Sequence, residues 1–230
     1  MNVAIIPARG GSKRIPRKNI KFFKGKPMLA YSIEAAKKSG CFDRIIVSTD
    51  DNEIAEMAIS LGAEVPFIRP ANLADDHTAT VPVIKHAIEK LVSDGSDIQY
   101  ACCIYATAPF IEANDLKSAF DKIKASNSRY CLSVTTFAYP IQRSLRIKDS
   151  GFIEMIQPEN YSVRSQDLEE AYHDAGQFYF GSYNAWIHEL PILADQSLPV
   201  IIPRNRVQDI DTLEDWRQAE LIYELNKINK

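Results

Sequence analysis

Short apolar runs alternate with segments of helical periodicity from the N-terminus to Phe137. The runs that fit buried strands are Val3–Pro7, Arg44–Thr49, Glu64–Phe67, Tyr100–Ala106 and Cys131–Phe137. The segments with a helical repeat are Met28–Lys38, Glu53–Leu61, Val81–Leu91 and Asn114–Ala125. Asp50 or Asp51 is placed to cap the second of these helices, and Gly40 to end the first. Apolar strands joined by helices predict an α/β fold with a mixed, mainly parallel sheet and helices on both faces.

This alternation stops after Phe137. Residues 138–176 are polar, rich in Tyr, Arg and Gln, and show no long helical repeat. The strand-like and helical segments beyond them are Gln177–Ser182, Pro199–Ile202 and Leu213–Lys227. No internal repeat or flexible linker divides the sequence. We therefore predict one domain over residues 1–230, with residues 138–180 forming an arm inserted into it.

Composition and charge narrow the class of protein. With 230 residues, 46% hydrophobic and 25% charged, the chain has an ordinary globular composition. Its formal net charge of −3 argues against a general nucleic-acid or membrane-surface binder, because such proteins are normally basic. No apolar run approaches the ~20 residues of a membrane span, and no signal peptide is expected. The four cysteines lack zinc-ligand spacing, and Cys102 and Cys103 lie in an apolar run, which favours buried reduced thiols. We expect a cytoplasmic protein.

A basic loop with two glycines follows the first predicted strand. The segment AIIPARGGSKRIPRKN, residues 4–19, contains a cluster of cations: Arg9, Lys13, Arg14, Arg17 and Lys18. The Gly-Gly pair lets backbone amides approach an anion, the cations neutralise a polyphosphate, and the amide of Asn19 is suited to a base or a ribose. The spacing fits neither the Walker A loop nor the GxGxxG fingerprint. A solvated basic turn is the alternative, but a position after the first strand of an α/β pattern favours a phosphate site.

Two acidic residues near the C-terminus form a second candidate site. Asp209 and Asp211, in the segment VQDIDT, are separated by one residue, so an extended backbone directs both carboxylates to one side. Such a pair chelates a hard cation, and Mg²⁺ typically takes one or two carboxylates together with water and substrate phosphates. The alternative is helix capping, in which Asp211 or Thr212 caps the terminal helix. On these residues alone both interpretations stand.

Four segments together are similar to a known family. IIPARGGSKRIPRKN, FDRIIVSTDDNEIAEMA, RPANLADDHTATVPV and QDIDTLEDW resemble the bacterial CMP-sugar synthetases of nonulosonic acids, enzymes that activate sialic-acid-like sugars with CTP. The resemblance covers roughly residues 3–220. Within that superfamily the stretches FAYPIQRSLRI and RSQDLEEAYHDAGQFYFG look most like those of the pseudaminic acid cytidylyltransferases.

The resemblance implies a Rossmann-like fold, a homodimer whose arm reaches toward the partner, and Mg²⁺-dependent transfer of CMP from CTP with release of pyrophosphate. The nucleotide-binding residues that it implies are Ala8, Arg9, Gly10, Ser12, Lys13, Lys18, Asn19, Arg69, Thr80 and Tyr105. It assigns Mg²⁺ to Asp209 and Asp211. The catalytic residues are then Arg9 and Lys13, which stabilise charge on the leaving pyrophosphate, and Asp211 as a candidate general base.

The sugar side departs from the N-acetylneuraminate synthetases. Those enzymes carry a QPTSPLR-like segment where this chain reads YATAPFI, with Tyr105 in place of the glutamine. They carry an RPNG-like segment where this chain reads HDAG, with His173 in place of the arginine. The candidate sugar-binding residues are Gln142, Arg143, Arg164, His173, Asp174, Gln177 and Tyr179. Arg143 and Arg164 are able to grip the sugar carboxylate through paired hydrogen bonds, and a dimer contact is the alternative role for each.

Other functions remain alternatives at this stage. A CMP-N-acetylneuraminate synthetase, or another enzyme for sialic-acid-like sugars, would keep the same nucleotide loop. A regulatory module that binds the nucleotide without turnover has no need of the Asp209–Asp211 pair. An NAD-dependent oxidoreductase expects GxGxxG and an acidic residue ~20 residues further on. A nucleotide-sugar glycosyltransferase usually carries its metal-binding acids in the middle of the chain.

Overall fold

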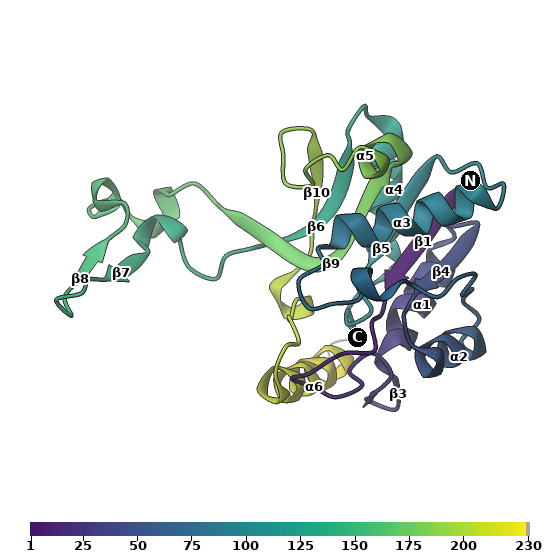
Figure 1. Cartoon of the computed structure of the whole chain (residues 1–230). Coiled ribbons are helices and arrows are strands. Elements are labelled where there is room, and N and C mark those ends of the chain that lie inside the picture. Colours follow the sequence, from purple (N-terminus) through teal and green to yellow (C-terminus); the bar gives the residue numbers. More distant parts are fainter. Residues whose placement is uncertain (229–230) are drawn as a thin grey trace.

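A computed structural model describes residues 1–228, so the last two residues of the predicted 1–230 domain lie outside the described residues. The centre of the molecule is a sheet with the strand order β10-β6-β9-β5-β1-β4 (Figure 1). Its strands are β1 (Asn2–Pro7), β4 (Arg44–Ser48), β5 (Tyr100–Ile104), β6 (Tyr130–Thr136), β9 (Tyr172–Ser182) and β10 (Ser197–Ile201). The β1 strand pairs in parallel with β4 and β5, and β10 pairs in parallel with β6. Only β9 among these strands runs antiparallel to its neighbours, so the sheet is mixed and mainly parallel, as predicted.

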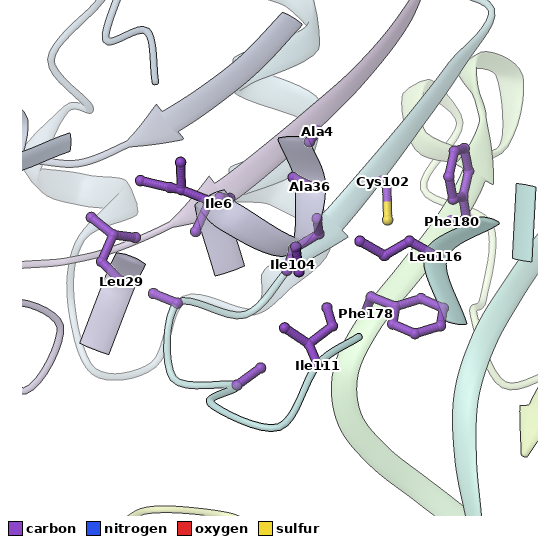
Figure 2. Packing of buried hydrophobic residues seen from close by; sticks show 14 of the residues in the cluster. Ala4, Ile6, Leu29, Ala36, Cys102, Ile104, Ile111, Leu116, Phe178 and Phe180 are labelled. Carbon is purple, nitrogen blue, oxygen red and sulfur yellow. The ribbon is translucent and has the colours of Figure 1, made fainter. Parts of the chain in front are cut away.

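Helices cover both faces of this sheet. One face is covered by α1 (Met28–Ser39), α2 (Asn52–Ser60) and α4 (Ala113–Ala125), and the other by α3 (Thr80–Ser93) and α5 (Tyr183–Ile187). Figure 2 shows the core under the first of these faces, a cluster that includes Leu29 of α1, Leu116 of α4 and Phe178 of β9. Burial of such large apolar side chains contributes roughly 1.5–3 kcal/mol each relative to exposure. Asp51 caps α2 through its carboxylate, which accepts the Ile54 N–H at 3.0 Å.

A third core fixes the C-terminal helix beside the N-terminal loop. The α6 helix (Leu213–Ile228) packs against the small hairpin of β2 (Phe22–Phe23) and β3 (Lys26–Pro27). The ring of Phe23 meets that of Trp216 edge to face, with centroids 5.4 Å apart. Buried Ile15, from the predicted phosphate loop, belongs to the same cluster. This packing brings the segment before α6 next to the loop after β1, although about 190 residues separate them in sequence.

The segment between β6 and β9 leaves the body of the molecule as an extended arm (Figure 1). We call residues 138–171 the arm. It contains the hairpin β7 (Leu145–Ile147) and β8 (Ile153–Met155) and three 3₁₀ turns, Ile141–Arg143, Pro158–Asn160 and Ser165–Asp167. Many of its apolar side chains are exposed, among them Tyr139, Ile147, Phe152 and Tyr161. Two further 3₁₀ turns, Ala71–Leu73 and Arg204–Arg206, lie outside the arm.

Some predicted boundaries were wrong. Glu64–Phe67 forms no strand, because it meets its neighbour only through single bridges at Glu64 and Ile68. The predicted strand Gln177–Ser182 begins earlier, at Tyr172, so its first residues belong to β9 and pair with the end of β6. The short helix α5 was not predicted.

All four cysteines are buried and free, which confirms the prediction for Cys102 and Cys103. Within residues 1–228, no helix is long and apolar enough to cross a membrane.

Candidate active site

The candidate site lies where the parallel strands β1, β4 and β5 end. The loops that follow β1 and β5, together with residues 69–80 and the segment before α6, line a cavity of about 330 Å³. Ligands of open α/β sheets bind at this edge. The predicted residues that line the cavity are Arg9, Ser12, Lys13, Lys18, Asn19, Arg69, Thr80, Tyr105, Asp209 and Asp211. Ala8 and Gly10 belong to the loop, but the cavity wall does not include them.

Hydrogen bonds fold the loop after β1 into a fixed shape. The Ala8 N–H donates to the Ser48 carbonyl at 2.9 Å, which continues the pairing of β1 with β4. The side-chain amide of Asn19 donates to the Arg9 carbonyl at 2.9 Å and ties the two ends of the loop together. Asn19 is only 6% exposed, and the hydrogen bond from its amide nitrogen holds the loop in place. The Lys18 ammonium donates to the Ile210 carbonyl at 2.6 Å and joins the loop to the segment before α6.

The end of β4 supports the glycines of this loop. The Gly10 N–H donates to Asp50 Oδ1 at 3.0 Å. A β-carbon at Gly10 would lie 2.7 Å from Asp51 Oδ2, so only glycine fits this close approach without a shift. The guanidinium of Arg17 donates to both carboxylate oxygens of Asp51, at 2.6 and 2.9 Å. This hydrogen bonding lowers the pKa of Asp51 to about 2.

A single carboxylate engages two of the loop cations. Asp76 accepts a hydrogen bond from Arg9 Nη1 at 2.5 Å and another from the Lys13 ammonium. The hydrogen bond from Lys13, followed by that from Arg9, lowers the pKa of Asp76 to about 2. Both pairs are accessible to solvent, with the Lys13 side chain 80% exposed. A phosphate that binds these cations therefore meets an anion already in place.

Arg69 is a buried cation at the wall of the same cavity. It is 4% exposed, and its Nε and Nη2 atoms have no hydrogen-bond partner within the described residues. Its nearest carboxylate, that of Asp50, lies 3.8 Å from Nη2, which is too long for a hydrogen bond. Burial lowers the pKa of Arg69. Because a buried charge without a hydrogen-bonded partner is unfavourable, this guanidinium is suited to an anionic ligand.

The acidic pair lies opposite the basic loop. Asp211 Oδ2 is 3.0 Å from Arg14 Nη2, and its Oδ1 is 3.5 Å from Lys18 Nζ. Burial and then the neighbouring charge of Asp211 raise the pKa of Asp209. Thr212 and Asp215, and not the acidic pair, cap the start of α6. Thr212 Oγ1 accepts the Asp215 N–H at 3.2 Å, and Asp215 accepts the Thr212 N–H at 2.7 Å, which is the reciprocal arrangement of a capping box. Neither carboxylate of the predicted metal pair is used as the cap.

Tyr105 forms the inner wall of the cavity and connects it to β9. Its hydroxyl and Thr80 Oγ1 are hydrogen-bonded at 3.0 Å, and burial raises its pKa. Its ring meets the ring of Tyr179 edge to face, with centroids 5.6 Å apart. The Tyr179 hydroxyl donates to Asp174 Oδ2 at 2.5 Å. Two predicted sugar residues, Asp174 and Tyr179, thus lie behind the nucleotide residue Tyr105 and do not line the cavity.

The other predicted sugar residues are also away from the cavity. In the arm, the side chain of Gln142 donates to the Glu169 carbonyl, Arg143 to the Val163 carbonyl and Arg164 to Asp167. Gln177 is 4% exposed and donates to the Arg206 carbonyl at 2.6 Å, and exposed His173 contacts Phe137. Sugar binding by these residues stays a prediction.

Asp50 and Asp76 were missed by the sequence interpretation. Asp50 directly follows a predicted strand, and that position alone was a signal because ligand loops follow the carboxyl ends of strands. No sequence pattern indicated Asp76, because its hydrogen bond with Arg9 forms only when residues 69–80 fold back over the loop that follows β1. Thr107 lines the cavity and lies in the loop that follows β5, so its position after a predicted strand was the same kind of signal.

The fold and the site define a class: an α/β protein with a cavity lined by cationic and acidic side chains at the carboxyl edge of its sheet. Comparison with known proteins narrows it. The cytidylyltransferase family model matches residues 3–199, and the chain belongs to that family. A pseudaminic acid cytidylyltransferase from Campylobacter jejuni is 48% identical over 225 residues, which cover 98% of this chain and 97% of the relative.

More distant relatives agree on the family. A CMP-N,N'-diacetyllegionaminic acid synthase from Legionella pneumophila is 30% identical over 234 residues, with 98% of this chain and 97% of the relative covered. A solved structure of CMP:2-keto-3-deoxy-manno-octonic acid synthetase, complexed with CTP, superposes with a TM-score of 0.71. At 15% identity, with 98% of this chain and 99% of that chain covered, this likeness shows a shared fold.

Proposed function

We propose that this protein transfers CMP from CTP to the anomeric hydroxyl of a nonulosonic acid, with pseudaminic acid as its substrate, and that it requires Mg²⁺. The observation that carries the proposal is the convergence of ten predicted nucleotide and metal residues on one cavity. The choice of pseudaminic acid is supported by the relative that is 48% identical over nearly the whole length of both chains. The cytoplasmic location stays a prediction.

The cations of the cavity are arranged to bind a triphosphate. Arg9 and Lys13 share one exposed carboxylate, that of Asp76, and Arg69 has buried N–H groups without partners. Charge-assisted hydrogen bonds to phosphate are roughly twice as strong as those between neutral groups. We therefore assign Arg9 and Lys13 to the phosphates that depart and Arg69 to a phosphate deeper in the cavity.

Asp209 and Asp211 are suited to a magnesium ion. Both carboxylates line the cavity beside the basic loop. A pair of carboxylates suits Mg²⁺, which completes its octahedron with phosphate oxygens and water. Burial and then the neighbouring charge of Asp211 raise the pKa of Asp209, and a bound cation would offset both effects. When bound, Mg²⁺ would supply charge neutralisation at the phosphates.

The reaction is a displacement at the α-phosphorus. The anomeric oxygen of the sugar forms a bond to this phosphorus, the bond from phosphorus to the bridging oxygen of the β-phosphate breaks, and pyrophosphate leaves. Arg9 and Lys13 stabilise the negative charge that grows on the departing oxygens. Asp211, which lies in the same cavity, is the proposed acceptor of the hydroxyl proton.

We further propose that the protein acts as a homodimer and that the arm supplies sugar contacts to the partner. Arg143 and Arg164 lie within the arm and do not line the cavity of their own chain. Exposed apolar side chains such as Tyr139, Ile147 and Phe152 are concentrated along the arm. Contiguous exposed apolar surface marks a protein interface more often than a free surface.

Pyrophosphate release from CTP, measured with a panel of nonulosonic acids, tests the function. We expect Mg²⁺-dependent release with pseudaminic acid and slower release with N-acetylneuraminic acid. Faster turnover of N-acetylneuraminic acid would reject the assigned sugar and leave the cytidylyltransferase reaction standing. Tight binding of CTP with no release in the presence of any sugar would instead favour a regulatory nucleotide-binding module.

A further inference from the structure

Asp76 neutralises the two cations that the proposed reaction needs for pyrophosphate. Its Oδ1 accepts the Arg9 hydrogen bond at 2.5 Å, and its Oδ2 accepts that of the Lys13 ammonium. Arg9, Lys13 and Asp76 all line the same cavity. The carboxylate thus bridges two cations as a phosphate group would, with one oxygen on each.

The adjacent residue builds the turn that presents this carboxylate. Asp75 Oδ1 accepts the His77 N–H at 2.9 Å, and the Thr78 N–H and Thr78 hydroxyl at 2.7 Å each. Asp75 therefore folds the chain between Leu73 and the start of α3, and Asp76 faces the loop after β1. The two neighbouring aspartates have separate tasks, one in the turn and one on the cations.

A polyphosphate and Asp76 cannot share the two cations without repulsion. Both are anions, and each approaches the same guanidinium and ammonium groups. Ion pairs that are exposed to solvent, as these are, hold weakly and exchange readily. A ligand with several negative charges is therefore able to displace the carboxylate, and the carboxylate returns when that ligand leaves.

We propose that Asp76 is an internal competitor for pyrophosphate: it holds Arg9 and Lys13 before CTP binds, yields to the β- and γ-phosphates, and returns to promote pyrophosphate release. The inference rests on the proposed function and deepens it. Asp76 is a positioning residue, because it acts through the two cations and forms no bond to the reacting atoms. No covalent step is involved, since two ion pairs are exchanged for contacts with phosphate.

The test is the affinity of the full-length protein for inorganic pyrophosphate, measured by calorimetry with Mg²⁺ and without sugar. Asp76→Asn keeps the size of the side chain and removes its charge, so we expect pyrophosphate to bind about 3- to 10-fold more tightly. Pyrophosphate should also inhibit turnover by Asp76→Asn at a concentration lower by the same factor. Asp76→Glu keeps the charge and should stay near the wild type.

Asp75→Asn is the matched control. Asp75 also lines the cavity, but its carboxylate bonds to the turn and to neither loop cation, so Asp75→Asn removes one negative charge from the cavity without freeing Arg9 or Lys13. Its amide oxygen still accepts the hydrogen bonds of the turn. We expect its affinity for pyrophosphate to match the wild type. Cytidine, which lacks phosphates, should bind equally to all four proteins.

Weaker binding of pyrophosphate to Asp76→Asn would overturn the proposal, because it would mean that the carboxylate orients the cations for the ligand. Unchanged binding would also overturn it, as would an equal gain in Asp75→Asn. These results are independent of turnover. An absence of CMP transfer with every sugar contradicts the proposed function, whereas the pyrophosphate affinities of the variants decide the role of Asp76.

Discussion

The nucleotide cavity and the arm differ in one respect: the candidate binding residues of the cavity come together within one chain, and those of the arm do not. In the cavity, Asn19 braces the loop, Lys18 joins it to the segment before α6, and Arg69 is buried with N–H groups that have no partner in the described structure. In the arm, Arg143 and Arg164 bond to groups of the arm itself, and large apolar side chains are exposed. The sheet and its loops hold the proposed phosphate residues together, whereas the proposed sugar residues of the arm lie away from the cavity of their own chain.

Loss of the acidic pair should have the largest effect on the cavity. We expect Asp209→Ala and Asp211→Ala each to lower kcat at saturating Mg²⁺ by about 1,000-fold or more, because a metal supplies several kcal/mol and each 1.36 kcal/mol is tenfold in rate. Steady-state kinetics over a range of Mg²⁺ concentrations measures the effect, and circular dichroism monitors the fold.

Thr212→Ala is the control for this prediction. It removes the hydroxyl that caps α6, so it should reduce the free energy of unfolding by ~1 kcal/mol and leave the Mg²⁺ dependence unchanged. If the aspartate variants lose their helical signal, or if Thr212→Ala loses activity to the same extent, the pair is structural and the metal assignment is wrong.

Removal of the arm arginines should affect one substrate only. Arg143→Ala and Arg164→Ala each remove a guanidinium proposed for the sugar carboxylate, so the KM of the sugar should rise about 10- to 100-fold and that of CTP should not change. Arg146→Ala, an exposed arm residue paired with Glu154, is the control and should leave both values unaltered. Equal increases in both KM values would contradict the proposal that the arm binds the sugar and the cavity binds CTP.

The smallest predicted effect concerns the support of the phosphate loop. The pKa of Asp51 is lowered to about 2 by Arg17, below its unfolded value near 3.9. A lowered pKa means that the ionised form stabilises the fold at neutral pH and that this contribution disappears as the pH falls from about 4 to about 2. Asp51→Asn keeps the cap of α2, so after allowance for solvent screening it should lose ~1–2 kcal/mol of unfolding free energy at pH 7.

Urea unfolding at pH 7 and at pH 2.5 checks this prediction. The difference between the wild type and Asp51→Asn should be largest at pH 7 and should shrink at the lower pH. A difference of the same size at both values would show that the Asp51 charge does not support the loop.

Sequence patterns predicted the parts of the fold that have one dominant physical cause. Apolar runs such as Val3–Pro7 are strands because both faces of the sheet are covered, and the basic loop after β1 contributes to the predicted cavity. Glu64–Phe67 shows the same apolar character but lies beyond β4 at the edge and makes only single bridges. The first residues of β9, Tyr172 and His173, are polar and exposed, so their pairing with β6 left no apolar signal.

The site was predictable where a residue follows a strand and not where two loops must meet. Ser12 and Lys13 belong to the loop that follows β1, so the position of the motif placed them at the cavity. Asp76 bonds to Lys13 and Arg9 across 63 and 67 residues of sequence, and only the folded chain shows this pairing. The Tyr179 hydroxyl bonds to Asp174 behind Tyr105, and its side chain packs on the face of the sheet that α3 and α5 cover, so its role toward the sugar stays a prediction.

The most direct test of the central claim is to remove the arm and measure CTP binding. Thr136 of β6 pairs with Tyr172 of β9, and the Phe137 N–H donates to the Ala171 carbonyl at 3.2 Å, so a two-residue Asn-Gly turn is able to replace residues 138–170. The account predicts that this variant binds CTP with Mg²⁺ within about threefold of the wild-type affinity, while sugar-dependent pyrophosphate release is lost. Loss of CTP binding by a folded variant, or full turnover without the arm, would contradict it.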